Sequence, residues 1–164
     1  MTRLNHAVLY VRDVEVSVAF YRDALGFKVV NEMPGAAFLQ APASTNDHDL
    51  GLFQIGAAAG PSGAGRSTVG LYHLAWEVDT LAELGRLAQE LSQRGALVGA
   101  SDHSTTKSLY AHDPDGLEFE VAWIVPAAFI DDAMLAERGV QPLDLPKEIA
   151  RFGETTRGGV GVSV

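Results

Sequence analysis

The chain has 164 residues, which is enough for one domain with a hydrophobic core or for two small fused units. Its formal net charge of −9 repels nucleic-acid phosphates and anionic lipid, and its lack of cysteine excludes disulfides, thiolate metal sites and cysteine nucleophiles. The first residues lack a signal-peptide hydrophobic region, and no apolar run approaches the roughly 18 residues that span a bilayer. We therefore expect a cytoplasmic protein that binds neither nucleic acid nor membrane.

The first third of the chain follows a strand–helix–strand–strand–strand pattern. Apolar residues at helical spacing come after the first strand, and Gly26 stands where a helix commonly ends. Pro34 and Gly35 mark a turn between two further strands. The expected elements are a strand at 4–11, a helix at 14–25 and strands at 27–33, 36–42 and 50–56. Residues 1–56 are thus predicted to form a βαβββ module.

The same pattern restarts after a segment rich in Gly, Ala, Ser and Pro, residues 57–68, which predicts a linker. The repeated elements are a strand at 70–78, a helix at 81–94 and strands at 96–100, 108–112 and 117–125. Residues 69–125 are therefore predicted to form a second βαβββ module. Because repeats of this kind usually pack as a pseudo-symmetric pair, we expect an α+β fold whose two modules form a concave half-barrel site.

Residues 126–164 fall outside the repeat and form a C-terminal extension. We expect short amphipathic helices at 127–139 and 145–153, followed by a loose tail at 154–164. Covering a sheet edge and joining a dimer contact are the two roles that we weigh for this extension.

Two histidines occupy corresponding places in the repeat, His6 in "LNHAVLYV" and His73 in "LYHLAWEV". Side chains alternate along a strand, so each histidine lies opposite an apolar face that packs on a helix. The last strand places Glu118 and Glu120 opposite an apolar face in the same way. Two histidines and a carboxylate suit an Fe(II) site with open positions. Structural histidines and a surface-facing polar row are the alternatives at this point.

The stretches "LNHAVLYVRDVEVSVAFYRDALGF", "YHLAWEVD" and "DPDGLEFEV" resemble the vicinal oxygen chelate superfamily over residues 1 to about 124. That superfamily includes glyoxalase I, fosfomycin- and bleomycin-resistance proteins, methylmalonyl-CoA epimerase and extradiol ring-cleaving dioxygenases. The chain is most similar to the single-unit type I extradiol, catechol 2,3-dioxygenase-like enzymes. This resemblance implies metal ligands at His6, His73 and Glu120. Glu120 is preferred to Glu118 because it follows the "DPDG" turn at the family's offset.

Three further residues match positions that are particular to the extradiol dioxygenases. His48 in "DHDLGLF" stands at the start of the fourth strand, and Tyr110 stands ten positions before Glu120. His103 lies upstream of Tyr110, at a spacing about two residues shorter than usual. The resemblance implies that His48 is the acid/base, and that Tyr110 and His103 hydrogen-bond substrate oxygen.

The activity implied by the resemblance is cleavage of a catechol-like aromatic diol with O2 by a homodimeric, Fe(II)-dependent dioxygenase, with Mn(II) or another divalent metal as the alternative cofactor. A glyoxalase- or epimerase-type lyase or isomerase is the first alternative, and its fourth metal ligand would have to be Gln54. A fosfomycin-type resistance enzyme needs a cation-rich pocket, which a chain of net charge −9 supports poorly. A metal-free drug-binding protein is the last alternative, although such binders usually lack the His/His/Glu set.

Overall fold

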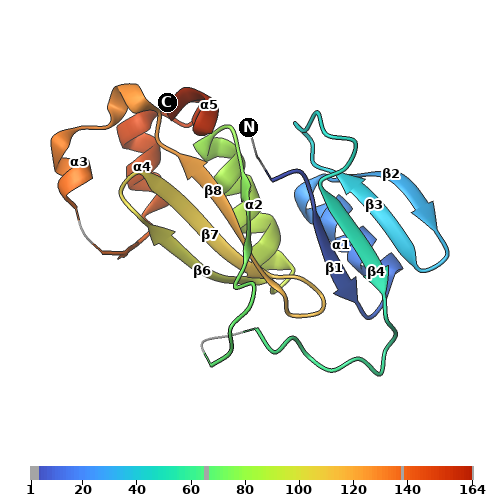
Figure 1. Cartoon of the computed structure of the whole chain (residues 1–164). Coiled ribbons are helices and arrows are strands. Elements are labelled where there is room, and N and C mark those ends of the chain that lie inside the picture. The colour runs from blue at the N-terminus through green and yellow to red at the C-terminus, as the bar shows by residue number, and fades with distance from the viewer. Residues whose placement is uncertain (1–3, 65–66, 138, 164) are drawn as a thin grey trace. The chain divides into compact units, whose positions relative to one another are not determined.

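The computed structural model describes residues 4–64, 67–137 and 139–163 (Figure 1). The chain divides into two compact units. The first unit runs to Gly63 and includes the turn Asp113–Leu117, and the second runs from Ala64 to His112 and from Glu118 onward. In the part of the chain that is described, no helix is long and apolar enough to cross a membrane.

The first unit is a four-stranded sheet covered by one helix (Figure 1). Its elements are β1 (Ala7–Val11), α1 (Val14–Leu25), β2 (Lys28–Met33), β3 (Ala36–Gln40) and β4 (Leu50–Gln54). The strand order is β1-β4-β3-β2, in which β1 and β4 run parallel and the other pairs run antiparallel. The buried face of the sheet carries Leu9, Val11, Leu39, Leu50 and Leu52, and α1 contacts strands β2, β3 and β4.

Helix α1 begins and ends where the sequence predicts. The carboxylate of Asp13 accepts hydrogen bonds from the backbone N–H groups of Glu15 and Val16, which satisfies two otherwise unpaired donors. Gly26 ends the helix with a φ of 76°, in the left-handed region that glycine adopts without steric cost.

The second unit is a five-stranded sheet with the order β5-β8-β7-β6-β9. Its elements up to residue 124 are β5 (Leu74–Glu77), α2 (Leu81–Gln93), β6 (Leu97–Asp102), β7 (Thr106–His112) and β8 (Glu118–Ile124). Helix α2 buries a stripe of leucines against the sheet, and β8 contributes three buried residues at alternate positions to the same core, namely Phe119, Val121 and Trp123. The predicted α+β class, with two βαβββ modules, is confirmed.

The C-terminal extension forms η1 (Ala127–Phe129), α3 (Asp132–Ala136), β9 (Gln141–Pro142), α4 (Leu145–Phe152) and α5 (Val160–Ser163). The helix predicted over 127–139 is split, because η1 ends at Phe129 and α3 begins only after the N-cap Asp131; residue 138 lies outside the described residues. Strand β9 pairs with β6 and so lies at the edge of the sheet.

The prediction of a loose tail at 154–164 is wrong. The backbone N–H of Gly158 donates to the carbonyl of Asp79 at 2.8 Å, and that of Gly159 donates to the carbonyl of Ile124 at 3.0 Å. Both glycines are buried against the carboxyl ends of β5 and β8. The glycine-rich composition that suggested a mobile tail instead permits a close backbone contact.

Both histidines that are predicted as metal ligands lie just outside the strands that were expected to contain them. Strand β1 begins at Ala7 rather than Leu4, and β5 begins at Leu74 rather than Gly70. His6 and His73 therefore each occupy the position immediately before the first strand of a module. The two histidines thus occupy equivalent positions in the secondary structure, as they do in the repeated sequence.

Candidate metal centre

The first unit brings His6 and His48 together. Strands β1 and β4 pair in parallel with Ala7 opposite Leu50, so the residues that precede them emerge at the same end of the sheet. The two imidazole rings lie 4.4 Å apart between centroids, and Phe38 packs edge-on against His48 at 5.2 Å. His48 lies in the loop before β4 rather than in the strand.

The ring of His6 is oriented by its neighbour Asn5. Nδ1 of His6 lies 2.8 Å from Oδ1 of Asn5, and because this amide oxygen can only accept, Nδ1 is the donor. The lone pair of the neutral ring is then on Nε2, the atom that remains able to bind a metal ion.

The loop that carries His48 is held by Asp49. Its Oδ1 accepts from the Ser44 hydroxyl and from Nδ2 of Asn46, both at 2.8 Å, and its Oδ2 accepts from the backbone N–H of Ala41 at 2.8 Å. This network closes the segment between β3 and β4 into a defined loop.

The second unit brings together His73, Glu120, Tyr110 and His103. Nε2 of His73 lies 3.1 Å from Oε2 of Glu120, since β5 and β8 pair in parallel with Ala75 opposite Glu120. The other oxygen of Glu120, Oε1, accepts a hydrogen bond of 2.5 Å from the hydroxyl of Ser108, a fully buried residue on β7. The carboxylate is thereby fixed with Oε2 directed at His73.

Tyr110 stands opposite Glu120 in the β7–β8 ladder, and its phenol oxygen lies 2.8 Å from Nε2 of His103. Burial raises the pKa of Tyr110, and the negative charge of Glu120 raises it further. The phenol is therefore protonated at neutral pH and able to donate. The short spacing between His103 and Tyr110 in the sequence does not prevent their contact.

Glu118, the carboxylate that was not preferred as the metal ligand, lies between two histidines. Its Oε1 is 3.9 Å from Nδ1 of His73, and its Oε2 is 3.6 Å from Nε2 of His112, with 21% of the side chain exposed. Both distances exceed those of a direct hydrogen bond, and Nδ1 of His73 is buried without a hydrogen-bond partner. Glu118 is thus an outer neighbour of His73, whereas His112 is exposed.

The predicted ligands His6, His73 and Glu120 have donor atoms of the kinds that bind a divalent metal ion. Among the described residues, no three His, Asp or Glu side chains gather closely enough to hold an ion. Within the second unit, the 3.1 Å separation of Nε2 and Oε2 suits two donors bound at about 2.1 Å and at right angles to one ion, and it equally suits a direct ion pair. Two imidazoles and a carboxylate are the donors that Fe(II) and Mn(II) accept.

Gln54, the residue that a glyoxalase-type site would need as a fourth ligand, is engaged elsewhere. Its Oε1 accepts a hydrogen bond of 3.1 Å from the backbone N–H of Val14 at the start of α1. The side chain thus serves the N-terminus of the helix, and the oxygen that would coordinate a metal is directed there.

The sequence reasoning missed Asn5 and Ser108, which orient a predicted ligand in each unit. Ser108 lies on the same face of β7 as Tyr110, two positions away. The alternation of side chains along the strand could therefore have placed Ser108 beside the predicted site. Asn5 adjoins His6 in the sequence, but nothing in the pattern of residues indicates which of its atoms faces the ring.

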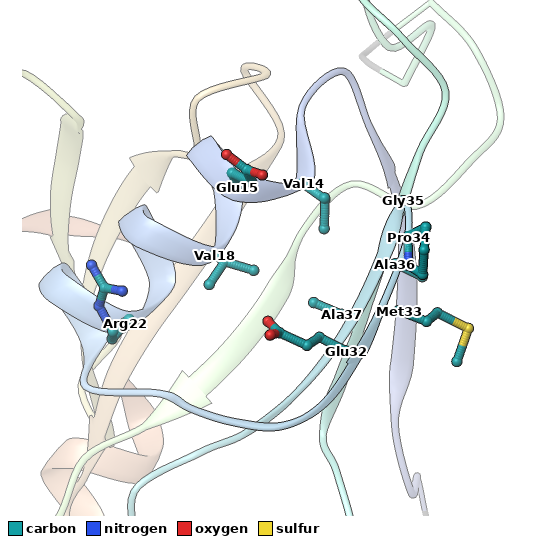
Figure 2. A pocket seen from close by; sticks show the side chains of 10 residues that line it. All are labelled: Val14, Glu15, Val18, Arg22, Glu32, Met33, Pro34, Gly35, Ala36 and Ala37. Atoms are coloured by element: carbon teal, nitrogen blue, oxygen red, sulfur yellow. The ribbon is translucent and has the colours of Figure 1, made fainter.

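A pocket of about 620 Å³ lies in the first unit between α1 and the β2–β3 hairpin (Figure 2). Its apolar lining includes Val14 and Val18, and its charged residues are Glu15, Arg22 and Glu32. None of the predicted site residues lines it, so it has no part in the candidate metal centre.

The duplicated βαβββ architecture defines a class of small α+β proteins. A family model, the Glyoxalase/Bleomycin resistance protein/Dioxygenase superfamily, matches residues 3–121, and the chain belongs to this superfamily.

Two curated relatives are dioxygenases. The chain is 32% identical to catechol-2,3-dioxygenase from Bacillus subtilis (strain 168), over 73% of this chain and 41% of that protein. It is 35% identical to biphenyl-2,3-diol 1,2-dioxygenase 3 from Rhodococcus globerulus, over 70% of this chain and 59% of that protein. The chain therefore spans about half the length of these relatives.

A solved structure of lactoylglutathione lyase from Agrobacterium tumefaciens matches with a TM-score of 0.55 and 22% identity, over 74% of this chain and 93% of that one. At this identity the match shows the shared fold alone. A single scaffold thus carries different reactions, and the function has to be argued from the site.

Proposed function

We propose that the protein is a metal-dependent extradiol dioxygenase that cleaves the ring of a catechol-like aromatic diol with O2. The observation that carries the proposal is the pairing of His73 with Glu120, whose second oxygen is held by buried Ser108. The similarity to two diol dioxygenases supports it. Both atoms of O2 enter the product in such a reaction, so no external reductant is required.

The residues that would hold the metal are His6, His73 and Glu120, with Fe(II) as the proposed ion and Mn(II) or another divalent metal as the alternative. Bound there, the ion supplies a Lewis acid that lowers the pKa of vicinal hydroxyls and a redox centre for O2. Asn5 presents Nε2 of His6 as the donor atom, and Ser108 presents Oε2 of Glu120.

The remaining site residues handle protons and orient substrate. The protonated phenol of Tyr110, held at 2.8 Å by His103, donates a hydrogen bond to a substrate oxygen. The ring of His48 lies 4.4 Å from that of the proposed ligand His6, and His48 serves as the acid/base because imidazole gains and loses a proton near neutral pH. Loss of a general acid/base costs on the order of 10²–10⁴ in rate. A His48→Ala enzyme that keeps its iron and its full turnover would overturn that role.

The proposal is tested by anaerobic reconstitution with Fe(II), followed by a screen of catechols for the yellow ring-fission product. Metal analysis of protein purified without chelator separates the alternatives. A protein without a stoichiometric transition metal would point to a metal-free binder. Zn, Ni or Co together with isomerase activity would point to a glyoxalase-type enzyme, for which Gln54 would have to leave Val14.

A further inference from the structure

The turn that carries His103 is strained. It joins β6, which ends at Asp102, to β7, which begins at Thr106. Ser104 has a φ of 68° and is the only residue other than glycine, in the part of the chain that is described, with a positive φ. A side chain in this left-handed region costs energy, so the conformation persists only when neighbouring contacts enforce it.

The first of these contacts come from α3 and β9 of the C-terminal extension. The hydroxyl of Ser104 is buried and donates to the backbone carbonyl of Met134 in α3 at 2.8 Å. Strand β9 pairs with the end of β6, with Gln141 opposite Asp102. Both contacts reach the turn from outside residues 3–121, the span that the family model matches.

A further contact is a buried chain of charges from α4. Nζ of Lys107 lies 3.0 Å from Oε2 of Glu148 and 2.6 Å from Oδ1 of Asp102. The side chains of Lys107 and Glu148 are only 1% and 2% exposed. The same Oδ1 of Asp102 accepts the backbone N–H of Ser104 at 2.7 Å. A carboxylate in the extension is thereby connected, through one lysine, to the backbone of the turn.

We propose that the C-terminal extension is a positioning element of the candidate site, with Glu148 and Lys107 as the positioning residues. They hold the 102–106 turn so that Nε2 of His103 stays within hydrogen-bond distance of the Tyr110 phenol. We call this hold of the extension on the 102–106 turn the clamp, and it is inferred from the contacts above alone. Its consequence for catalysis rests on the proposed function. A fixed His103 keeps the Tyr110 hydroxyl in one orientation toward substrate.

Glu148→Gln in the full chain tests the clamp, because it removes the charge that faces Lys107 with little change in volume. Glu137→Gln is the matched control, since Glu137 belongs to the same extension but is exposed. Two structural readouts are taken: amide hydrogen exchange at Ser104 and Thr105, and the ¹⁵N chemical shift of Nε2 of His103. We expect at least tenfold faster exchange and a shifted Nε2 signal in Glu148→Gln, and neither change in Glu137→Gln.

Unchanged exchange and an unchanged His103 signal in Glu148→Gln would overturn the clamp. Should Glu148→Gln fail to fold, Ser104→Ala removes only the hydrogen bond to Met134 and is read by the same two signals. In an active enzyme we expect kcat to fall at least tenfold with KM within threefold, and unchanged kcat would overturn the positioning role. A loosened turn in a protein whose wild type cleaves no catechol would support the clamp and overturn the proposed function.

Discussion

Ser108 donates its buried hydroxyl to Oε1 of Glu120 at 2.5 Å and so leaves Oε2 of the same carboxylate 3.1 Å from Nε2 of His73. This relationship joins three strands, because Ser108 lies on β7, Glu120 on β8 and His73 directly before β5. One oxygen of the Glu120 carboxylate thus accepts a hydrogen bond from Ser108, and the other faces His73 in the candidate metal centre.

Ser108→Ala is expected to weaken metal binding about 10- to 100-fold, since residues that orient a ligand commonly have effects of this size. The free energy of unfolding should fall by about 1–3 kcal/mol, because the carboxylate loses a buried partner. Titration of the apo-protein with Co(II), followed by its visible absorption, measures the first effect. Ser92→Ala, at an exposed position in α2, is the control. Equal metal affinity in the Ser108 and Ser92 variants would contradict the assigned role.

The two carboxylates beside His73 are expected to differ in their effect on metal content. Glu120→Gln should lose stoichiometric metal, because Oε2 of Glu120 is the proposed ligand. Glu118→Gln should retain metal with at most about a tenfold loss of affinity, since Glu118 is an outer neighbour of His73. Elemental analysis after dialysis distinguishes them. Metal lost from Glu118→Gln and kept by Glu120→Gln would reverse the assignment.

Asp113 is expected to make stability fall with rising pH. Its carboxylate is buried, accepts hydrogen bonds from the Tyr21 hydroxyl and from the backbone N–H groups of Asp115 and Leu117, and has a pKa raised by burial from the ordinary 3.8. A carboxyl group whose pKa is higher in the folded than in the unfolded protein makes its full contribution to stability at pH values below its pKa in the unfolded protein. That contribution is lost as the pH rises from about 4 through the folded pKa.

Asp113→Asn should remove this loss, since the amide oxygen can still accept both backbone N–H groups. The difference in unfolding free energy between wild type and variant should therefore shift in favour of the variant as the pH rises above about 4. Urea unfolding at pH 3.5, 5 and 7 measures it, with exposed Asp132→Asn as the control. A difference that stays constant over this range, or moves in favour of the wild type, would contradict the prediction.

Gly158→Ala is expected to destabilise the second unit by about 1–3 kcal/mol, because there is no room for a side chain. An added Cβ would overlap the carbonyl oxygen of Ile124 and lie 2.5 Å from Nε1 of Trp123. Gly161→Ala is the control, because its Cβ would meet nothing within 4 Å, and it should change stability by less than about 1 kcal/mol. Thermal unfolding compares the two, and equal melting temperatures would show that the tail is not docked as described.

The sequence was informative wherever the relevant signal was local or repeated. The duplicated strand patterns predict both βαβββ units, and the end of α1 follows from Gly26. His6 and His73 could be singled out because they recur at equivalent places in the two modules. Their roles as ligands remain predictions.

What the sequence could not show depends on contacts between residues distant in the chain. The pairing of Lys107 with Glu148 joins positions 41 residues apart, and neither residue belongs to a motif. The docked tail was mistaken for a loose one because glycine is common both in mobile segments and in close backbone contacts. Composition alone does not separate these two uses, whereas the hydrogen bond from Gly158 to Asp79 does.

The most direct test of the central claim is O2 consumption by the Fe(II)-reconstituted protein with catechol substrates, measured together with the ring-fission product. We predict one O2 consumed for each ring cleaved, and loss of both signals in Glu120→Gln, which removes the proposed ligand with little change in side-chain volume. Full Fe(II) loading without catechol-dependent O2 uptake, or undiminished ring cleavage by Glu120→Gln, would contradict the account.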